Sequence, residues 1–366
     1  MSKKIRVGLL FGGRSGEHEV SLASASSVLK ALNPKKYQVT PIGITRHGQW
    51  RVGSSASQRL HEVLERGTPV LPSADPTGPN LVPVDQKRTQ PAGPQVDVMF
   101  PVLHGTFGED GTVQGLFELA NVPYVGAGVL ASAVGMDKDV MKRLFRDAGL
   151  PVVKWVCVLR REWERSPESV SRRIKKKLRY PAFVKPANSG SSVGISKARN
   201  AKELRAAMNL AAKYDRKIVV EQGLDAREIE CSVLGNEHPR ASVPGEVVPV
   251  NEFYDYEAKY LKEGSELIIP APLSPKQTRQ VRELAVRAFQ AVDAAGMARV
   301  DFLLDRKTRR IFVNEINTIP GFTSISMYPK LWEASGLAYR KLLDRLIELA
   351  FERHRDRIRR AYTLHS

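Results

Sequence analysis

Two apolar stretches joined by a polar turn predict a β-hairpin near the carboxyl end of the chain. They are 299–305 (RVDFLLD) and 311–317 (IFVNEIN), with RKTRR between them. Side chains alternate between the two faces of a strand. One face is therefore predicted to be core: Val300, Phe302, Leu304, Phe312 and Ile316. The other face is polar: Arg299, Asp301, Glu315 and Asn317.

The polar face is a candidate metal site. If the hairpin is symmetric about Thr308, Asp301 lies across from Glu315, on the face that Asn317 shares. Two carboxylates and an amide oxygen form a hard donor set, which suits Mg²⁺. The alternative is a solvated face with an ion pair between Asp301 and Arg299. The adjoining IPGFTS turn and a lysine- and glycine-rich loop upstream favour the metal site.

The amino-terminal pattern predicts a strand, a glycine turn and a helix. Apolar residues 5–11 precede GGRSGEHEV, and backbone N–H groups at such a helix start can hold an anion. A dinucleotide fingerprint is disfavoured, because the glycines read G-G-x-x-G and the next strand, 37–45, lacks a terminal acid. Glu17 and Glu19 at the turn are helix-capping acids or, alternatively, ligands for a substrate ammonium.

The next informative position is His104. Residues 53–95 predict a long surface excursion around one short helix near 58–66, without bearing on chemistry. Strand 96–103 then runs into HGTFGEDG, so His104 follows the carboxyl end of a strand, where open α/β sheets place ligands. A lone histidine is more often structural, but the glycine turns and acids beside it make substrate contact a competing interpretation.

A second lysine- and glycine-rich region indicates phosphate binding. A helix predicted over 129–148 places Lys138 and Lys142 one turn apart. The strand AFVKP ends near Lys185 and is followed by NSGSSVG, a turn rich in hydroxyl and N–H donors. Lysine precedes the glycines, the reverse of a P-loop, although both would hold phosphate oxygens through the same physics. The alternative is an ordinary hairpin turn.

Downstream residues supply candidate nucleotide contacts and a functional loop. Glu221 and Glu228, on strands near 217–224 and 227–235, could accept from an adenine amine or ribose hydroxyls. Residues 249–264 hold three tyrosines without apolar periodicity, which is typical of a mobile functional loop. A capped helix follows from SPKQ, and the chain closes on an amphipathic basic helix.

Composition narrows the class. The chain has 366 residues, a hydrophobic fraction of 42% and a net charge of +18, enough for two or three domains with an anionic ligand. The basic residues lie mainly on predicted helix faces and turns, so we expect no nucleic-acid partner. Two cysteines without metal or disulfide spacing, and no apolar run long enough to span a membrane, predict a cytoplasmic protein without a membrane partner.

Taken in order, the motifs resemble the D-alanine–D-alanine ligase family of the ATP-grasp superfamily. They are GGRSGEHEVSLASA, HGTFGEDGTVQG, MDKDVMK, VKPANSGSSVGI, EFYDYEAKY, RVDF and NEINTIPGFTSISM. The resemblance implies an α/β ATP-grasp fold: a Rossmann-like domain over 1–126, a central subdomain over 127–225 and a carboxyl-terminal subdomain over 226–366. It also implies ATP-dependent joining of two D-alanines for peptidoglycan synthesis through an acyl phosphate, with two Mg²⁺ or Mn²⁺ ions, in a homodimer.

The same resemblance implies a role for each matching residue. The residues implied to bind ATP are Lys138, Lys185, Ser191, Ser192, Glu221 and Glu228. Metal ligands are Asp301, Glu315 and Asn317. The first D-alanine is held by Glu17 with His104 nearby, and its reacting oxygen faces Arg299 and the Gly321 N–H. The second D-alanine is held by Lys259, Ser326 and Met327. The residues implied to close the loop over the site form a hydrogen-bonded trio: Glu17, Ser191 and Tyr260.

Two departures from the family pattern are mild. Gln222 and Met327 stand where some relatives carry lysine and leucine. The competing interpretations are a D-alanine–D-lactate ligase, which Tyr260 in YDYEAKY disfavours, and a non-catalytic nucleotide-binding protein, which the full acid set of the hairpin disfavours.

Overall fold

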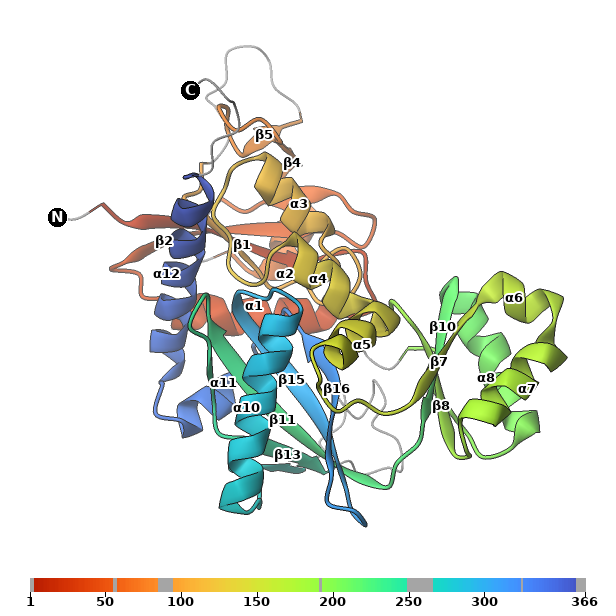
Figure 1. Cartoon of the computed structure of the whole chain (residues 1–366). Coiled ribbons are helices and arrows are strands. Elements are labelled where there is room, and N and C mark those ends of the chain that lie inside the picture. Colours follow the sequence, from red (N-terminus) through yellow and green to blue (C-terminus); the bar gives the residue numbers. More distant parts are fainter. Residues whose placement is uncertain are drawn as a thin grey trace.

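In the computed structural model, which describes residues 3–54, 58–84, 95–190, 193–248, 266–323 and 325–359, the described strands form three sheets (Figure 1). Helices pack against each sheet, which confirms the predicted α/β class. Every helix in these ranges is too short or too polar to cross a membrane.

The first sheet has the strand order β5-β4-β3-β2-β1-β6. Its strands are β1 (Ile5–Gly12), β2 (Tyr37–Ile44), β3 (Trp50–Val52), β4 (Thr68–Pro72), β5 (Leu81–Pro83) and β6 (Val98–Pro101). β1 pairs in parallel with β2 and β6, and the outer pairs are antiparallel. Its helices are α1 (His18–Ala31), α2 (Leu60–Arg66) and α3 (Thr112–Leu119).

The predicted excursion over 53–95 proves partly wrong. Helix α2 lies where one short helix was expected, but β4 and β5 extend the first sheet. Both strands are short and end in proline. β5 is the edge strand of this sheet, where proline is tolerated, and the prolines of both strands break the alternating pattern by which strands are recognised.

The second sheet is antiparallel and forms the lobe at the right of Figure 1. Its order is β7-β10-β8-β9, from β7 (Trp155–Leu159), β8 (Ala182–Pro186), β9 (Ser196–Ala198) and β10 (Lys217–Gln222). Three helices complete its core: α6 (Arg160–Arg165), α7 (Pro167–Lys177) and α8 (Ala201–Tyr214). Lys185 on β8 and Glu221 on β10 lie on the face of this sheet that is opposite the core.

The third sheet has the order β14-β13-β11-β15-β16, with β12 beside β11. Its strands are β11 (Ala226–Gly235), β12 (Arg240–Ala241), β13 (Gly245–Val248), β14 (Glu266–Ile268), β15 (Gly296–Asp305) and β16 (Ile311–Asn317). Helices α10 (Pro275–Ala291), α11 (Met327–Ala334), α4 (Val129–Met136) and α5 (Lys138–Asp147) contact it. α10 begins with a capping box between Ser274 and Gln277, as its sequence predicts.

The single helix predicted over 129–148 is in fact two. Asp137 lies between α4 and α5 with extended backbone, and its carboxylate accepts from the N–H groups of Asp139 and Val140. Aspartate favours an N-cap over a helix interior, so it ends one helix and begins the next. α4 and α5 bury apolar residues in the core of the third sheet.

The hairpin formed by β15 and β16 confirms the predicted pairing of Asp301 with Glu315. A bulge at Asn314 then shifts the register, so that Phe302 pairs with Val313. The prediction that Phe312 is core is therefore wrong: Val313 is fully buried, whereas Phe312 is partly exposed. One extra residue in a strand reverses the faces of the side chains beyond it, which here are the residues between the bulge and the hairpin turn.

The last described helix, α12 (Tyr339–Arg357), joins the first and third sheets. Its apolar residues share a core with β1, α1 and the segment 319–322. Arg353 donates to the carbonyl of Tyr124 at 3.1 Å and stacks over that ring, 4.2 Å from its centroid. The segment after β16 is therefore packed directly against the first sheet.

Candidate active site

The polar face of the third sheet carries acids on three adjacent strands. Glu230 on β11 lies opposite Asp301 on β15, which lies opposite Glu315 on β16. Asn317 lies opposite Arg299 and donates from Nδ2 to Asp301 at 2.9 Å. The predicted metal ligands Asp301, Glu315 and Asn317 are thus neighbours on one surface.

Arg299 compensates the charge of these acids. Its Nε and Nη2 each lie 2.7 Å from an oxygen of Asp301, and its Nε lies 2.9 Å from Glu230. Such a two-point contact fixes the guanidinium plane and keeps a cation beside the acids. The Asp301–Arg299 ion pair that sequence offered as an alternative to metal binding is therefore present alongside the oxygen-rich set.

That donor set fits a hard divalent cation. Asp301 and Glu315 provide carboxylate oxygens and Asn317 an amide oxygen, the ligand type that Mg²⁺ and Mn²⁺ prefer. Within the described residues no three His, Cys, Asp or Glu side chains gather as a metal set, so the candidate set here consists of two carboxylates and one amide. Oxygen from a bound phosphate would complete such a shell.

Beyond β16 the chain forms a tight turn that presents Gly321. A Cβ added at Gly321 would lie 2.7 Å from Oγ of Ser326, so the position has no room for a side chain. That hydroxyl accepts from the N–H of Thr323 at 3.0 Å, and Met327 begins α11 directly afterwards. The backbone of Gly321 and the Ser326 side chain therefore share one corner.

The first sheet contributes Glu17 and His104. Glu17 is buried at the start of α1, and its Oε2 would lie 2.5 Å from a Cβ at Gly105 and 2.8 Å from one at Gly190. The carboxylate thus packs between the His104 loop and the loop after β8. This is where an ammonium-binding acid is predicted.

His104 is buried and joins the first sheet to the Gly321 turn. Its Nε2 lies 3.0 Å from Oγ of Ser24, and its Nδ1 lies 3.0 Å from the carbonyl of Ile319. Burial lowers the pKa of His104. Facing a carbonyl, Nδ1 carries a proton, so neutral His104 donates to Ile319 and accepts from Ser24.

A cluster of lysines lines the other side of the site. Lys138 donates to the carbonyl of Ser189 at 2.7 Å. Lys185 and Lys142 lie 2.8 Å and 3.3 Å from the two oxygens of Glu221. Burial alone would raise the pKa of Glu221, but the charges of Lys142 and Lys185 outweigh it and hold that pKa at about 2. Glu221 is therefore ionised at neutral pH.

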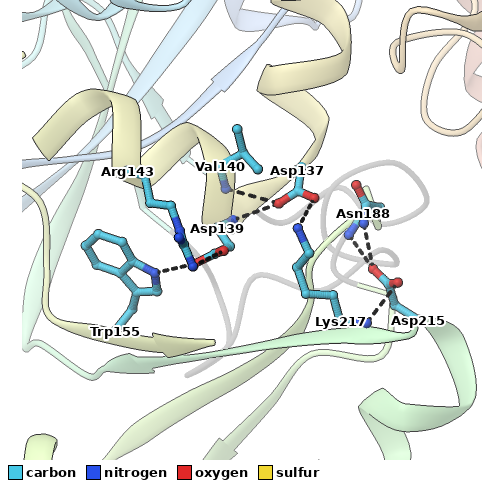
Figure 2. Close-up of polar contacts among 8 residues, drawn as sticks. All are labelled: Asp137, Asp139, Val140, Arg143, Trp155, Asn188, Asp215 and Lys217. Atoms are coloured by element: carbon cyan, nitrogen blue, oxygen red, sulfur yellow. Dashed lines mark hydrogen bonds and ion pairs between the residues drawn. The ribbon is translucent and has the colours of Figure 1, made fainter. Parts of the chain in front are cut away.

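Figure 2 shows polar contacts at the start of α5 and in the loop after β8. Lys217 on β10 lies 2.5 Å from the carboxylate of Asp137 that begins α5. Asp215 accepts from the backbone and side chain of Asn188, at 2.7 and 3.0 Å. The start of α5 and the loop after β8 are thus both fastened to the second sheet, which fixes Lys138 relative to Ser189.

One further predicted residue lies beside the acid row, and four others lie outside the described residues. Glu228 occupies β11 two positions before Glu230, so the two acids share a face. The predicted roles of Ser191, Ser192, Lys259 and Tyr260 fall on residues outside the described ranges.

Three residues of the site were missed or given no role from the sequence. Glu230 joins the acid row, and its two-residue spacing from Glu228 was an available signal. Lys142 pairs with Glu221. Its spacing from Lys138 was noted from the sequence, but no role was given to it. Glu109 contacts residue Ile319, 210 positions away, which no local pattern reveals.

Comparisons with known proteins agree with this geometry. Residues 6–127 match the family model described as D-ala D-ala ligase N-terminus, and residues 144–348 match D-ala D-ala ligase C-terminus. The D-alanine–D-alanine ligase of Heliobacterium modesticaldum is 54% identical over 359 residues, which span 98% of each chain. That of Thermoanaerobacter sp. strain X514 is 52% identical over 362 residues, spanning 98% of this chain and 99% of the relative.

Solved structures place the fold in the same group. The D-alanine–D-alanine ligase from Coxiella burnetii has a TM-score of 0.86 and 38% identity, covering 98% of this chain and 97% of that one. The VanG D-Ala:D-Ser ligase from Enterococcus faecalis has a TM-score of 0.84 and 36% identity, covering 95% and 100%. The chain belongs to the D-alanine–D-alanine ligase family.

Proposed function

We propose that this protein uses ATP to join two molecules of D-alanine into D-alanyl-D-alanine, a precursor for peptidoglycan. The observation that carries the proposal is the juxtaposition of three features around one hairpin. These are the acid row of Asp301 and Glu315, the Gly321 turn packed against His104, and the lysine pair on Glu221. Membership of the ligase family supports the substrate assignment.

In the first step a carboxylate oxygen of the first D-alanine attacks the γ-phosphorus of ATP. ADP leaves with the electron pair of the broken P–O bond, and an acyl phosphate forms. Lys138 and Lys185 are assigned to the phosphate charge, supported by their positions beside Ser189 and Glu221, and Ser191 and Ser192 are assigned to the covering loop. Glu221 and Glu228 are assigned to the adenine and ribose. Asp301, Glu315 and Asn317 would hold Mg²⁺ or Mn²⁺, which neutralises charge on the transferring phosphoryl group.

In the second step the amine of the second D-alanine attacks the acyl carbon. Inorganic phosphate leaves with the C–O bond pair, and the amine loses its extra proton to the departing phosphate or water. Arg299 and the Gly321 N–H are assigned to the oxyanion, and one such donor is worth about 3–4 kcal/mol in comparable sites. Because Arg299 is held at two points by Asp301, it needs little reorganisation as charge develops.

The two amino acids are assigned to neighbouring sets of residues near the Gly321 turn. Glu17 binds the ammonium of the first, beside His104, while Ser326, Met327 and Lys259 hold the carboxylate of the second. Tyr260 and Ser191 join Glu17 to close the site, which protects the acyl phosphate from water.

Three further assignments belong to the same proposal. The chain is divided at residues 126 and 225 into the three predicted parts, each contributing one wall of the site. It works in the cytoplasm, which its two free cysteines, Cys157 and Cys231, support. It forms a homodimer, as the family resemblance implies.

One assay tests the substrate assignment. Phosphate release is measured with ATP, Mg²⁺ and, in turn, D-alanine, L-alanine, and D-alanine mixed with D-lactate or D-serine, and the products are identified by mass spectrometry. We expect D-alanine alone to suffice and L-alanine to fail. Predominance of mixed products would favour a D-lactate or D-serine ligase, and release independent of any amino acid would refute the proposal.

A further inference from the structure

Glu109 is an acid of the site to which the mechanism above gives no task. It lies in the loop between β6 and α3, and its carboxyl group reaches between the first sheet and the turn after β16. Both of its oxygens are occupied by backbone donors. Oε2 accepts from the N–H of Gly105 at 2.7 Å, and Oε1 accepts from the N–H of Ile319 at 3.1 Å.

One of these contacts leads to the ammonium-binding acid. Gly105 has positive φ, and its Cα approaches Glu17 so closely that a Cβ there would lie 2.5 Å from Oε2 of Glu17. The peptide that Glu109 holds is therefore the surface against which the Glu17 carboxylate packs. Ser15 ties the same two loops together by donating to the carbonyl of His104 at 2.7 Å.

The other contact leads to the oxyanion donor. Ile319 lies two residues before Gly321, and its N–H and C=O are both held from the first sheet's loops, by Glu109 and His104. Phe322, one residue after Gly321, donates to Oγ of Ser24 at 3.2 Å. The turn is thus fastened on both sides of Gly321 by groups from the first part of the chain.

We infer that Glu109 is a positioning residue that sets the distance between Glu17 and the Gly321 N–H, and thereby selects the chain length of the first amino acid. This inference rests on the proposed function, in which the ammonium of that amino acid meets Glu17 and its reacting carboxyl oxygen meets Gly321. An α-amino acid separates those groups by one carbon, and a β-amino acid by two. A spacing held through both oxygens of one carboxylate favours the shorter molecule.

The charges around Glu109 support the same role. Burial and then the negative charge of Glu17 raise the pKa of Glu109 to about 8, against opposing contributions from its backbone donors and Arg299. An ammonium bound at Glu17 would cancel the repulsion and favour the ionised form. Ionised Glu109 accepts two hydrogen bonds most strongly, so binding of the first substrate tightens the link to Gly321.

The test uses two variants and a matched control in the full-length enzyme. Glu109→Gln keeps the length but replaces one acceptor with a donor, and Glu109→Asp keeps the charge but is one methylene short. Asp110→Asn is the control, because Asp110 sits in the same loop and accepts from the N–H groups of Phe107 and Thr112, at 2.8 and 3.0 Å, without reaching Ile319.

Each protein is given ATP, Mg²⁺ and equal D-alanine and β-alanine, and the dipeptides are quantified by mass spectrometry. We expect both Glu109 variants to lose about 100-fold in kcat/KM for D-alanine, the order of loss that a misplacement of about 1 Å causes. The ratio of β-alanyl-D-alanine to D-alanyl-D-alanine should rise at least tenfold, whereas KM for ATP and the control's product ratio stay unchanged.

An unchanged ratio in both Glu109 variants would overturn the inference, whatever their overall rate. If Glu109→Gln does not fold, Glu109→Asp alone decides the outcome by the same ratio. A wild-type enzyme that makes no dipeptide from D-alanine would instead refute the proposed function, so the two failures are distinguishable.

Discussion

Glu221→Gln tests whether the lysine cluster depends on one buried carboxylate. Glu221 is 3% exposed, and its oxygens lie 2.8 Å from Lys185 and 3.3 Å from Lys142. Glutamine keeps the shape but removes the charge. The two ammonium groups would then lose the carboxylate that pairs with both of them, with the weaker influence of Glu315 remaining on each, and we expect the unliganded protein to be destabilised.

Two ways of calculating the contribution of Glu221 to the free energy of unfolding agree. The pKa of Glu221 falls from 4.5 to about 2, which at about 1.4 kcal/mol per pKa unit corresponds to about 3 kcal/mol. Removing one partner of a buried ion pair costs about 3–5 kcal/mol. Because the folded-state pKa is depressed, this contribution is complete above pH 4.5 and is lost as the pH falls through about 2.

The assay is urea unfolding followed by circular dichroism at pH 7 and pH 4. We expect Glu221→Gln to lower the free energy of unfolding by about 3 kcal/mol at pH 7, with the difference narrowing by about 1 kcal/mol at pH 4. The control is Glu162→Gln, whose partly exposed pair with Arg173 should contribute under about 1 kcal/mol. A Glu221→Gln protein as stable as this control would refute the reasoning.

Three other changes have definite expected outcomes. Gly321→Ala would put a Cβ 2.7 Å from Oγ of Ser326 and displace the turn, so steady-state kinetics should show kcat about 100-fold lower with an unchanged KM for ATP; wild-type kcat would contradict the role of that turn. Glu315→Gln should fold normally by circular dichroism yet lose about 100-fold in phosphate release, because a metal ligand is gone; retained turnover would exclude Glu315 as a ligand. Ser274→Ala removes one half of a capping box and should cost about 1 kcal/mol of stability without changing kcat; unaltered urea unfolding would show that the cap contributes nothing.

The sequence predicted what depends on local pattern. Alternation along 299–317 was sufficient to place Asp301 opposite Glu315, and SPKQ was sufficient to predict the start of α10. The bulge at Asn314 escaped prediction, because no local signal marks one extra residue in an otherwise regular strand. The predicted polar face was therefore correct, but Phe312 was predicted on the core face and lies on the opposite one.

The parts of the site that escaped prediction depend on contacts between distant segments. Glu109 contacts Ile319, which is 210 positions away in the sequence. Lys142 on α5, a helix of the third sheet, contacts Glu221 on β10 of the second sheet. The type and spacing of these residues do not reveal their partners, since an acid in a loop and a lysine in a helix are ordinary on a surface. Only the fold turns them into buried partners of the residues that the motifs identify.

The most direct test of the proposed ligase activity is the stoichiometry of its products. Wild-type protein is incubated with ATP, Mg²⁺ and D-alanine, and ADP, phosphate and D-alanyl-D-alanine are quantified in the same samples over time. We predict one dipeptide and one phosphate for each ADP, and none of the three without D-alanine. ADP and phosphate formed without a matching amount of dipeptide would contradict the account.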